Sequence, residues 1–267
     1  MAIPIALTIA GSDSGGGAGV QADLKTFSAN RVYGASVITA LTAQNTREVR
    51  AIEDATPEFI AHQLDCVAED LAVDAVKVGM LSRVDTIGAV AAGLERHQLR
   101  QVVVDPVMVA KSGDALLAPQ AVDALRQTLM PLAKLITPNL PEAGVLLNAP
   151  APTDEGAMRE AARRLMELGC AAVLVKGGHL SGERNIDILF DGADFTRFEN
   201  TRVNTKNTHG TGCTLSSAIA ARLAHGDALE DAVGHAIRYV HEAIAMADEL
   251  SVGSGHGPVH HFYQLWG

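Results

Sequence analysis

Short apolar runs alternate along the chain with segments whose apolar residues recur at helical spacing. The runs are continuous rather than alternating with polar residues, which indicates strands covered on both faces of a sheet. Between the first two runs, Val20, Leu24 and Phe27 stand at i, i+4 and i+7, the spacing of one helix face. The predicted strands are 3–10, 34–43, 75–80, 101–105, 134–139 and 171–176, and further helices are predicted at 57–71, 86–99, 119–129, 154–168, 211–224 and 228–250.

This alternation predicts an α/β fold with a mostly parallel, doubly wound central sheet and helices on both faces. The segment 187–198 differs, because the turn residues Asp191 and Gly192 within it predict a hairpin. Pro141 stands where it can open a short helix after the strand at 134–139. The chain shows no internal repeat, low-complexity stretch or long linker, and we therefore expect residues 1–267 to form a single domain.

The composition narrows the class of protein. A net charge of −10 disfavours a nucleic-acid or anionic-membrane surface as partner, and an aromatic content of 4% disfavours a platform for stacked bases. The apolar N-terminus lacks a basic segment and is too short to span a membrane. Three widely spaced cysteines without a CxxC pair indicate neither a zinc site nor a disulfide frame and favour a reducing compartment. We expect a cytoplasmic protein with no nucleic-acid or membrane partner.

The segment 207–220, which reads N-T-H-G-T-G-C-T-L-S-S-A-I-A, combines a glycine loop, a cysteine and a helix start. Gly210 and Gly212 flank Thr211, Cys213 follows, and an apolar helical stretch begins here. A glycine loop that leads into a helix start points unpaired N–H groups at one place, with the positive end of the helix dipole behind them. This arrangement binds phosphate, and the same field would favour the thiolate of Cys213. The alternative is a plain turn beside a cysteine that acts as a small buried hydrophobe.

A second glycine-rich loop, G-S-D-S-G-G-G-A-G at 11–19, follows the first predicted strand. Five glycines in nine residues favour close approach of the backbone to a ligand over a merely flexible turn. Residues 17–22 match the G-x-G-x-x-G/A dinucleotide pattern, but the acid expected about 20 residues later is missing, so a dehydrogenase is the weakest alternative. The Walker pattern GxxxxGK[ST] is absent from the sequence, which excludes a P-loop enzyme.

Polar side chains stand where the predicted strands end, and in such sheets ligands bind beyond the carboxyl ends of the strands. Two of them, Asp105 and Glu142, suit Mg²⁺, and Lys176 suits the phosphates of ATP. The amides of residues 210–213 would hold a transferring phosphoryl group, and Cys213 is the candidate base for the acceptor hydroxyl. The complete set of strand-end residues is Gln44, Asp105, Asn139, Glu142 and Lys176.

Three of these residues also have a purely structural explanation. Asp105 precedes a proline and can form a turn, and Glu142 can be a first-turn acid favoured by the helix dipole. Lys176 can be a surface lysine at the end of a strand. Their joint occurrence at strand ends favours function over these separate explanations.

Eight motifs occur in order along nearly the whole chain: T-I-A-G-S-D-S-G-G-G-A-G-V-Q-A-D at 8–23, Y-G-A-S-V-I-T-A-L-T-A-Q-N-T at 33–46, V-K-V-G-M-L at 76–81, V-V-V-D-P-V-M at 102–108, T-P-N-L-P-E-A at 137–143, V-K-G-G-H at 175–179, H-G-T-G-C-T at 209–214 and G-S-G-H-G-P-V-H-H at 253–261. Any one would be a weak signal, but together they are highly specific. The sequence resembles the hydroxymethylpyrimidine/phosphomethylpyrimidine kinases of thiamin biosynthesis, within the ribokinase-like superfamily.

The resemblance implies a ribokinase-like homodimer that uses ATP and Mg²⁺ to phosphorylate 4-amino-5-hydroxymethyl-2-methylpyrimidine, and then its monophosphate to the diphosphate. Asn139 and Glu142 match the family's N-x-x-E motif for magnesium and phosphate, and Asp105 matches the acid of D-P-V-M. Residues 210–213 match the anion hole. Cys213 stands where many ribokinase-like sugar kinases have an aspartate base. Because a free thiol is mostly protonated at neutral pH, the local field must help it act as a base.

The resemblance also implies a pocket for the pyrimidine. The amide of Gln44 can accept a hydrogen bond from the exocyclic amine and donate one to the neighbouring ring nitrogen. Asp23 and the backbone near Gly11, Met80 and Val107 are expected pocket walls, with core packing as the alternative for Met80 and Val107.

The histidines are less informative. Thr208 and His209 directly precede the anion hole and are assigned to nucleotide binding, although His209 could instead cap the loop. The spacing of His179, His256, His260 and His261 indicates no metal site.

Two alternatives stay open at this point. A pyridoxal or pyridoxine kinase of the same fold would also phosphorylate a hydroxymethyl group on a six-membered nitrogen ring, and the sequence does not cleanly separate the two. A non-catalytic pyrimidine or nucleotide sensor would not need the complete set of strand-end residues, which argues against it.

Overall fold

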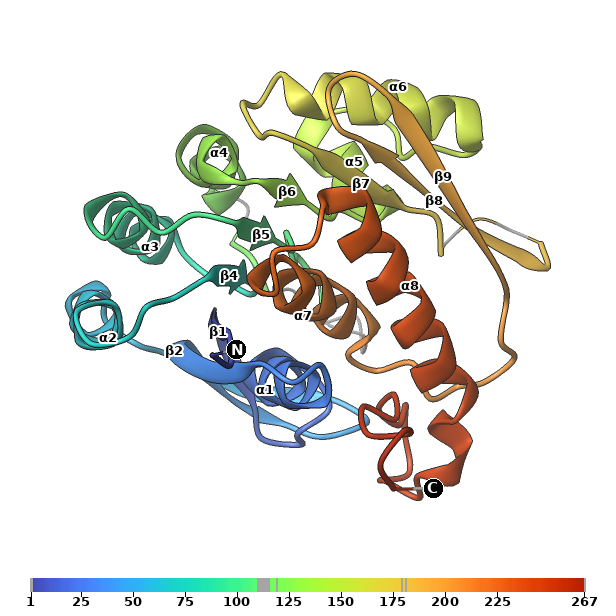
Figure 1. Ribbon diagram of the computed structural model, residues 1–267, viewed down its shortest axis with the longest axis horizontal. Helices are drawn as coiled ribbons and strands as arrows, with labels where there is room; N and C mark the ends of the chain where they lie inside the picture. Colours follow the sequence, from blue (N-terminus) through green and yellow to red (C-terminus); the bar gives the residue numbers. More distant parts are fainter. Residues whose placement is uncertain (1, 110–115, 119, 179, 181, 267) are drawn as a thin grey trace.

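A mixed sheet runs through the computed structural model, which describes residues 2–109, 116–118, 120–178, 180 and 182–266. Within these residues the sheet has nine strands in the order β3-β2-β1-β4-β5-β6-β7-β8-β9 (Figure 1). The strands are β1 (Ile5–Asp13), β2 (Tyr33–Gln44), β3 (Val49–Asp54), β4 (Ala75–Val78), β5 (Val102–Val104), β6 (Leu135–Ile136), β7 (Val173–Lys176), β8 (Arg184–Phe190) and β9 (Phe195–Thr201).

The six central strands, β2, β1, β4, β5, β6 and β7, are parallel, as predicted. The predicted hairpin is confirmed as the antiparallel pair β8 and β9, which extends one edge of the sheet. At the other edge β3 pairs antiparallel with β2. Strand β3 was not predicted, because its sequence V-R-A-I-E-D is short, half charged and largely exposed, and therefore lacks the continuous apolar run of a buried strand.

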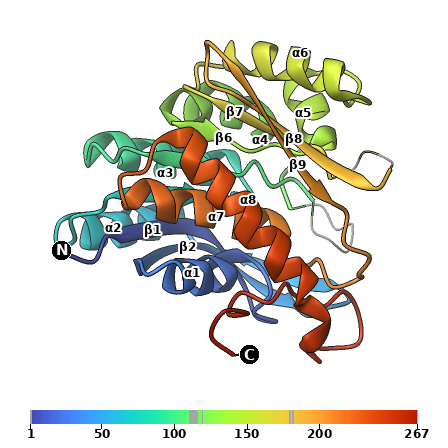
Figure 2. The ribbon, with the colours of Figure 1, turned by 45° about the vertical axis from the view of Figure 1, so that its right-hand side comes forward.

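Helices cover both faces of the sheet, which confirms the doubly wound arrangement. Figures 1 and 2 show α1, α7 and α8 on one face and α2 to α6 on the other. Helix α4 continues into a π-helical turn at Leu125–Leu129 and a 3₁₀ turn at Met130–Leu132. The helices are α1 (Gly19–Ala29), α2 (Pro57–Ala68), α3 (Val84–Arg96), α4 (Ala121–Ala124), α5 (Leu140–Leu147), α6 (Glu155–Met166), α7 (Thr211–Ala224) and α8 (Leu229–Ala245).

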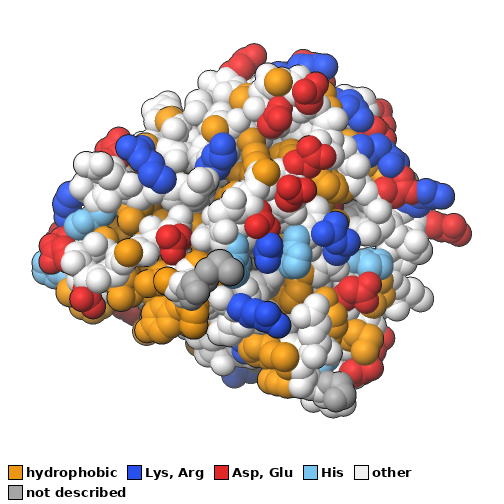
Figure 3. Space-filling view, viewed as in Figure 1, with side chains coloured by type: hydrophobic (Ala, Val, Ile, Leu, Met, Phe, Trp, Pro, Cys, Tyr) orange, Lys and Arg blue, Asp and Glu red, His pale blue; other side chains and the backbone are white. Residues whose placement is uncertain are grey.

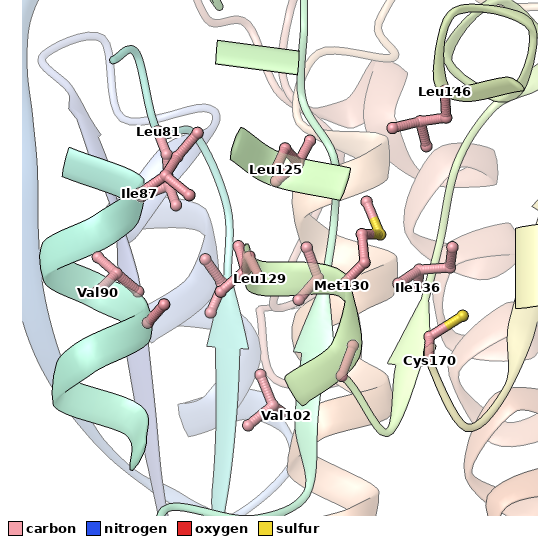
Figure 4. Close-up of a cluster of buried hydrophobic side chains, with 14 of the residues drawn as sticks. Leu81, Ile87, Val90, Val102, Leu125, Leu129, Met130, Ile136, Leu146 and Cys170 are labelled. Carbon is pink, nitrogen blue, oxygen red and sulfur yellow. The ribbon is translucent and has the colours of Figure 1, made fainter. Parts of the chain in front are cut away.

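The central strands are apolar on both sides because each side packs against a helix layer. In β5, Val102 and Val104 face one hydrophobic cluster and Val103 faces the other. Figure 4 shows part of the first cluster, where Val102 lies among Leu129 and Met130. Burial on both faces explains why these strands read as continuous apolar runs. It also brings the polar residues that follow the runs to one edge of the sheet.

The outer surface is mixed in character. Figure 3 shows acidic and basic side chains interspersed with apolar ones on the face that carries α7 and α8. Among the described residues, no helix has both the length and the apolar character needed to cross a membrane.

Candidate active site

Helix α7 begins at Thr211, where the sequence predicted it, and Gly210 caps its N-terminus with a left-handed backbone (φ 81°). A Cβ at Gly210 would overlap the carbonyl oxygen of Gly17, so the two glycine loops meet here with no room for a side chain. Within the described part of the chain, the amides of Gly212 and Cys213 donate to no protein group. Free amides at the positive end of a 14-residue helix are an arrangement that can hold an anion, the role expected of this segment from the sequence, and residues 210–213 are called the cradle below.

The close approach at Gly210 gives a first prediction. We expect Gly210→Ala to lower kcat at least about tenfold, because the loop must shift to admit a methyl group and a barrier change of about 1.4 kcal/mol is already tenfold. The control is Gly226→Ala, where the backbone is also left-handed (φ 87°) but nothing lies within 4 Å of the added Cβ. Equal kcat values for both variants in a coupled ADP-release assay would show that the contact with Gly17 is unimportant.

The cradle lies against an acid and a lysine that come from strand ends. A Cβ on Gly212 would lie 3.2 Å from Asp105 Oδ2 and 3.4 Å from Lys176 Nζ. Lys176 is the last residue of β7 and donates to Asp105 Oδ1 at 2.8 Å, and the Thr137 hydroxyl donates to the same oxygen at 3.2 Å. Burial lowers the pKa of Lys176, but the charges of Asp105 and Glu142 raise it more, so the ammonium stays protonated.

Asn139 and Glu142 form a capping box at the start of α5. The Glu142 amide donates to Asn139 Oδ1 at 2.9 Å, and the Asn139 amide donates to Glu142 Oε2 at 2.8 Å. The structural explanation of Glu142 as a first-turn acid is therefore correct. The same carboxylate also lies near Asp105 and Lys176, so the capping role does not exclude a role in the site. Burial raises the pKa of Glu142 to about 7, opposed by the charge of Lys176 and supported by that of Asp105.

This donor set fits Mg²⁺ in the way that kinases hold it. Among the described residues, no group of three or more His, Cys, Asp or Glu could enclose a metal ion. Mg²⁺ needs only one or two carboxylates, because water and phosphate oxygens supply its other ligands. Asp105 is buried and Glu142 lies close enough for their charges to interact, so the two acids can serve one cation beside the cradle.

A second group of polar side chains joins the first glycine loop to the segment before α7. His209 Nε2 lies 2.9 Å from Asp13 Oδ2 and 3.4 Å from Gln44 Nε2. Asp13 also accepts from the amides of Gly15, Gly17 and Ala18 at 2.8 to 3.0 Å. Burial raises the pKa of Asp13, but the bond to His209 and these amides lower it more, so the carboxylate is charged.

These contacts engage several polar groups of the first glycine loop, because three of its amides donate to the Asp13 carboxylate. The ring of His209 lies beside both Asp13 and Gln44, and its role in nucleotide binding stays a prediction. Thr208 precedes it, and the Thr208 carbonyl accepts from the amide and hydroxyl of Thr211 at 3.3 and 2.7 Å.

The remaining residues expected to line the pocket lie in two places in the structure. Gly11 and Met80 lie together, because a Cβ on Gly11 would lie 3.0 Å from the Met80 sulfur. Val107, two residues after Asp105, is half-buried, and its amide donates to the Asp105 carbonyl at 2.8 Å. His179 lies outside the described residues.

Asp23 is not a pocket wall, because its side chain is completely buried. Asp23 Oδ2 accepts from Lys77 Nζ at 2.8 Å and from the Thr8 hydroxyl at 2.6 Å, and Oδ1 accepts from the Ser217 hydroxyl at 2.7 Å. Burial lowers the pKa of Lys77, but the charge of Asp23 raises it more, so the pair is ionic. The network ties α1, β1 and β4 to α7, beneath the cradle.

The environment of Cys213 also differs from the expectation of a favoured thiolate. Burial raises the pKa of the Cys213 thiol to about 11, and the Lys77 ammonium and Gly19 amide only partly offset this effect. The charges of Asp23 and Asp105 raise the pKa further. The helix dipole favours the thiolate, but the two nearby carboxylates and the loss of water have the larger effect on the pKa.

Asp13 and Lys77 were missed by sequence reasoning. Asp13 stands among the glycines of the first loop, where an acid has no obvious partner. Lys77 interrupts the apolar strand A-V-K-V-G-M, and a charge in a strand buried on both faces must have an ion partner. The sequence therefore indicates that Lys77 has an ion partner, but it does not identify that partner as Asp23.

Comparisons with known proteins agree with this geometry. A family model described as phosphomethylpyrimidine kinase matches residues 13–260. The chain is 58% identical to the hydroxymethylpyrimidine/phosphomethylpyrimidine kinase of Rhizobium meliloti (strain 1021), over 98% of both chains. It is 54% identical to the protein of the same description from Escherichia coli (strain K12), again over 98% of both chains.

Solved structures support the fold. The ADP complex of Bacillus subtilis pyridoxal kinase has a TM-score of 0.92 and 38% identity, and the match covers 100% of each chain. This likeness confirms the ribokinase-like fold predicted from the motifs. The sequence motifs, the meeting of cradle, acids and lysine, and these full-length matches agree: the chain belongs to the phosphomethylpyrimidine kinase family and is a phosphotransferase.

Proposed function

We propose that this kinase transfers the γ-phosphoryl group of ATP to the hydroxymethyl group of 4-amino-5-hydroxymethyl-2-methylpyrimidine, and then phosphorylates the monophosphate to the diphosphate. The observation that carries this proposal is the meeting of the Gly212 and Cys213 amides with Asp105 and Lys176 at the start of α7. The relatives from Rhizobium meliloti and Escherichia coli, described as kinases of these two pyrimidines, support the choice of acceptor.

The proposed chemistry at the cradle is charge stabilisation. Phosphoryl transfer depends on positioning and on neutralising charge on the equatorial oxygens. The amides of residues 210–213 would hold the transferring group, and Lys176 would neutralise oxygens of the nucleotide. Asn139 and Thr208 would contact the nucleotide phosphates. Asp105 and Glu142 would hold Mg²⁺, which supplies further positive charge between the phosphates when bound.

The proposed acceptor side lies between the two glycine loops. Cys213 would first release its thiol proton to water, and the resulting thiolate would then take the proton of the attacking hydroxyl as the new bond to phosphorus forms. Gln44 would read the amine and ring nitrogen of the pyrimidine. His209, fixed by Asp13, would stand beside it, and Gly11, Met80 and Val107 would line the ring.

A pyridoxal kinase activity is the second candidate, because the Bacillus subtilis pyridoxal kinase shares the whole fold at a TM-score of 0.92. The deciding experiment is an ADP-release assay with Mg-ATP and three acceptors tested separately: the hydroxymethylpyrimidine, its monophosphate and pyridoxal. Turnover on both pyrimidines with little on pyridoxal supports the proposal. Turnover chiefly on pyridoxal contradicts it. Binding without turnover on any acceptor would identify a sensor.

The role of Gln44 gives a second prediction. We expect Gln44→Leu to raise the KM for the pyrimidine about 10- to 100-fold, because loss of one buried hydrogen-bonding partner costs about 1–3 kcal/mol. The KM for ATP should stay unchanged, and the exposed Gln127→Leu serves as control. An equal rise in both KM values would remove Gln44 from the acceptor pocket.

We further propose that residues 1–267 act as one catalytic unit, in a cytoplasmic homodimer. The single sheet that spans the described residues supports one unit. Light scattering on the purified protein tests the dimer, and a mass of one chain would contradict it.

A further inference from the structure

One sequence motif has no part in the site described so far. It is the C-terminal segment 253–261, G-S-G-H-G-P-V-H-H. Figures 1 and 2 both show the dark-red end of the chain between the end of α8 and the blue N-terminal third, which is distant from it in sequence. The segment is also attached to α8, because the Tyr239 hydroxyl donates to the carbonyl of His261 at 2.6 Å and the His260 amide donates to that of Ala243 at 2.8 Å.

The first half of the segment binds the loop that follows Gln44. The Gly255 amide donates to the Thr46 hydroxyl at 3.1 Å, and the His256 amide donates to the Thr46 carbonyl at 2.9 Å. A Cβ on Gly255 would overlap that carbonyl oxygen. Glycine is therefore required here, and its absence of a side chain lets the two backbones lie in contact.

The middle of the segment binds the residues before the cradle. The Gly257 amide donates to Asn207 Oδ1 at 3.0 Å. His209 donates from its amide to the Gly257 carbonyl at 3.0 Å and accepts at its carbonyl from the Val259 amide at 3.2 Å. The backbone of His209 is thus paired with the segment in a short parallel bridge around Pro258, while its ring faces Asp13 and Gln44.

The end of the segment reaches the cradle itself. His261 Nε2 lies 3.1 Å from the Thr214 hydroxyl, which donates to the Gly210 carbonyl at 2.8 Å. Because the hydroxyl has one proton, its oxygen accepts from Nε2–H of His261. Burial lowers the pKa of His261 to about 3, and nearby Lys25 acts in the same direction, so the ring is neutral and donates from one nitrogen. His261 and Thr214 are both buried.

We propose that segment 253–261 is a positioning element of the phosphoryl-transfer site and that His261 is its positioning residue. Through the Thr214 hydroxyl, His261 fixes the carbonyl of Gly210 and hence the direction of the cradle amides that follow it. The proposal rests on the proposed role of the cradle, and it explains why a segment distant in sequence contacts the Gln44 loop, His209 and Gly210 together.

The test compares steady-state kinetics of four variants at saturating Mg-ATP. We expect His261→Ala to lower kcat at least about tenfold, equivalent to about 1.4 kcal/mol, with KM values for both substrates changed less than about threefold. Thr214→Val should have a similar effect, and the double variant should be no slower than either single variant, because both act through one contact. His261→Gln, whose amide can still donate to the hydroxyl, should recover most of kcat. The control is His62→Ala, on the exposed side of α2.

Several results would overturn the proposal. One is unchanged kcat in His261→Ala, even if its melting temperature falls, because His261 would then only stabilise the fold. Another is additive losses in the double variant, and a third is a His261→Gln variant as slow as His261→Ala. If neither His261 variant folds, Thr214→Val decides, and normal kcat in it refutes the proposal. The kcat ratios are measured on whichever acceptor the wild type turns over, so an error in the proposed acceptor would be seen separately.

Discussion

Replacing Cys213 with alanine is expected to lower kcat by about 10²–10⁴, the usual contribution of a general base. ATP affinity should be unchanged, because the methyl group leaves the amides of residues 210–213 in place. The exposed Cys66 is the matched control, and Cys66→Ala should keep full activity. If Cys213→Ala turned over at the wild-type rate, the thiol would have no role in proton transfer.

The raised pKa of Cys213 adds a pH dependence to this prediction. A thiol with a pKa of about 11 is almost entirely protonated at pH 7, and the thiolate fraction grows about tenfold for each pH unit up to that pKa. The wild-type kcat/KM should therefore rise with pH between about 7 and 10, the opposite of a group that acts as a general acid. Cys213→Ala should lose this rise. A flat wild-type profile would mean that the reactive thiolate is not formed by simple ionisation.

Removing one partner of the buried Lys77–Asp23 pair is expected to lower the free energy of unfolding by about 3–5 kcal/mol, because an uncompensated charge would remain in the interior. Both side chains are completely buried, so water cannot replace the lost partner. Asp23→Leu should show the larger loss, since Lys77 has no other ion partner at hydrogen-bonding distance among the described residues. Lys77→Met leaves Asp23 with the hydroxyls of Thr8 and Ser217.

Urea unfolding followed by circular dichroism measures these losses. The double variant Lys77→Met/Asp23→Leu should be more stable than Asp23→Leu alone, because apolar side chains can replace a buried pair once both charges are gone. The control is Arg83→Ala, which removes an exposed ion pair of the same 2.8 Å length with Asp85 and should change stability little. A single Asp23 variant as stable as the wild type would show that the interior tolerates the isolated lysine.

Helices and strands with a continuous apolar or helical pattern could be predicted from the sequence. Helix α7 runs over Thr211–Ala224, the predicted range, because a glycine start, an apolar face and a closing glycine are all local signals. Strand β3 was missed because an exposed edge strand needs no apolar run. The capping box of Asn139 and Glu142 was also local, since it needs only residues three apart, and it coexists with the proposed metal role.

The sequence by itself determined the layered α/β fold, the anion cradle and the set of polar residues at the carboxyl ends of the strands. These follow from local periodicity, because parallel strands buried on both faces must end at one edge of the sheet. Only the tertiary structure decided which distant residues pair: Asp13 with His209, Asp23 with Lys77, and His261 with Thr214. It also decided that burial and two nearby carboxylates raise the pKa of the Cys213 thiol. Such pairings and pKa values depend on burial and on the path of the chain, which no local pattern encodes.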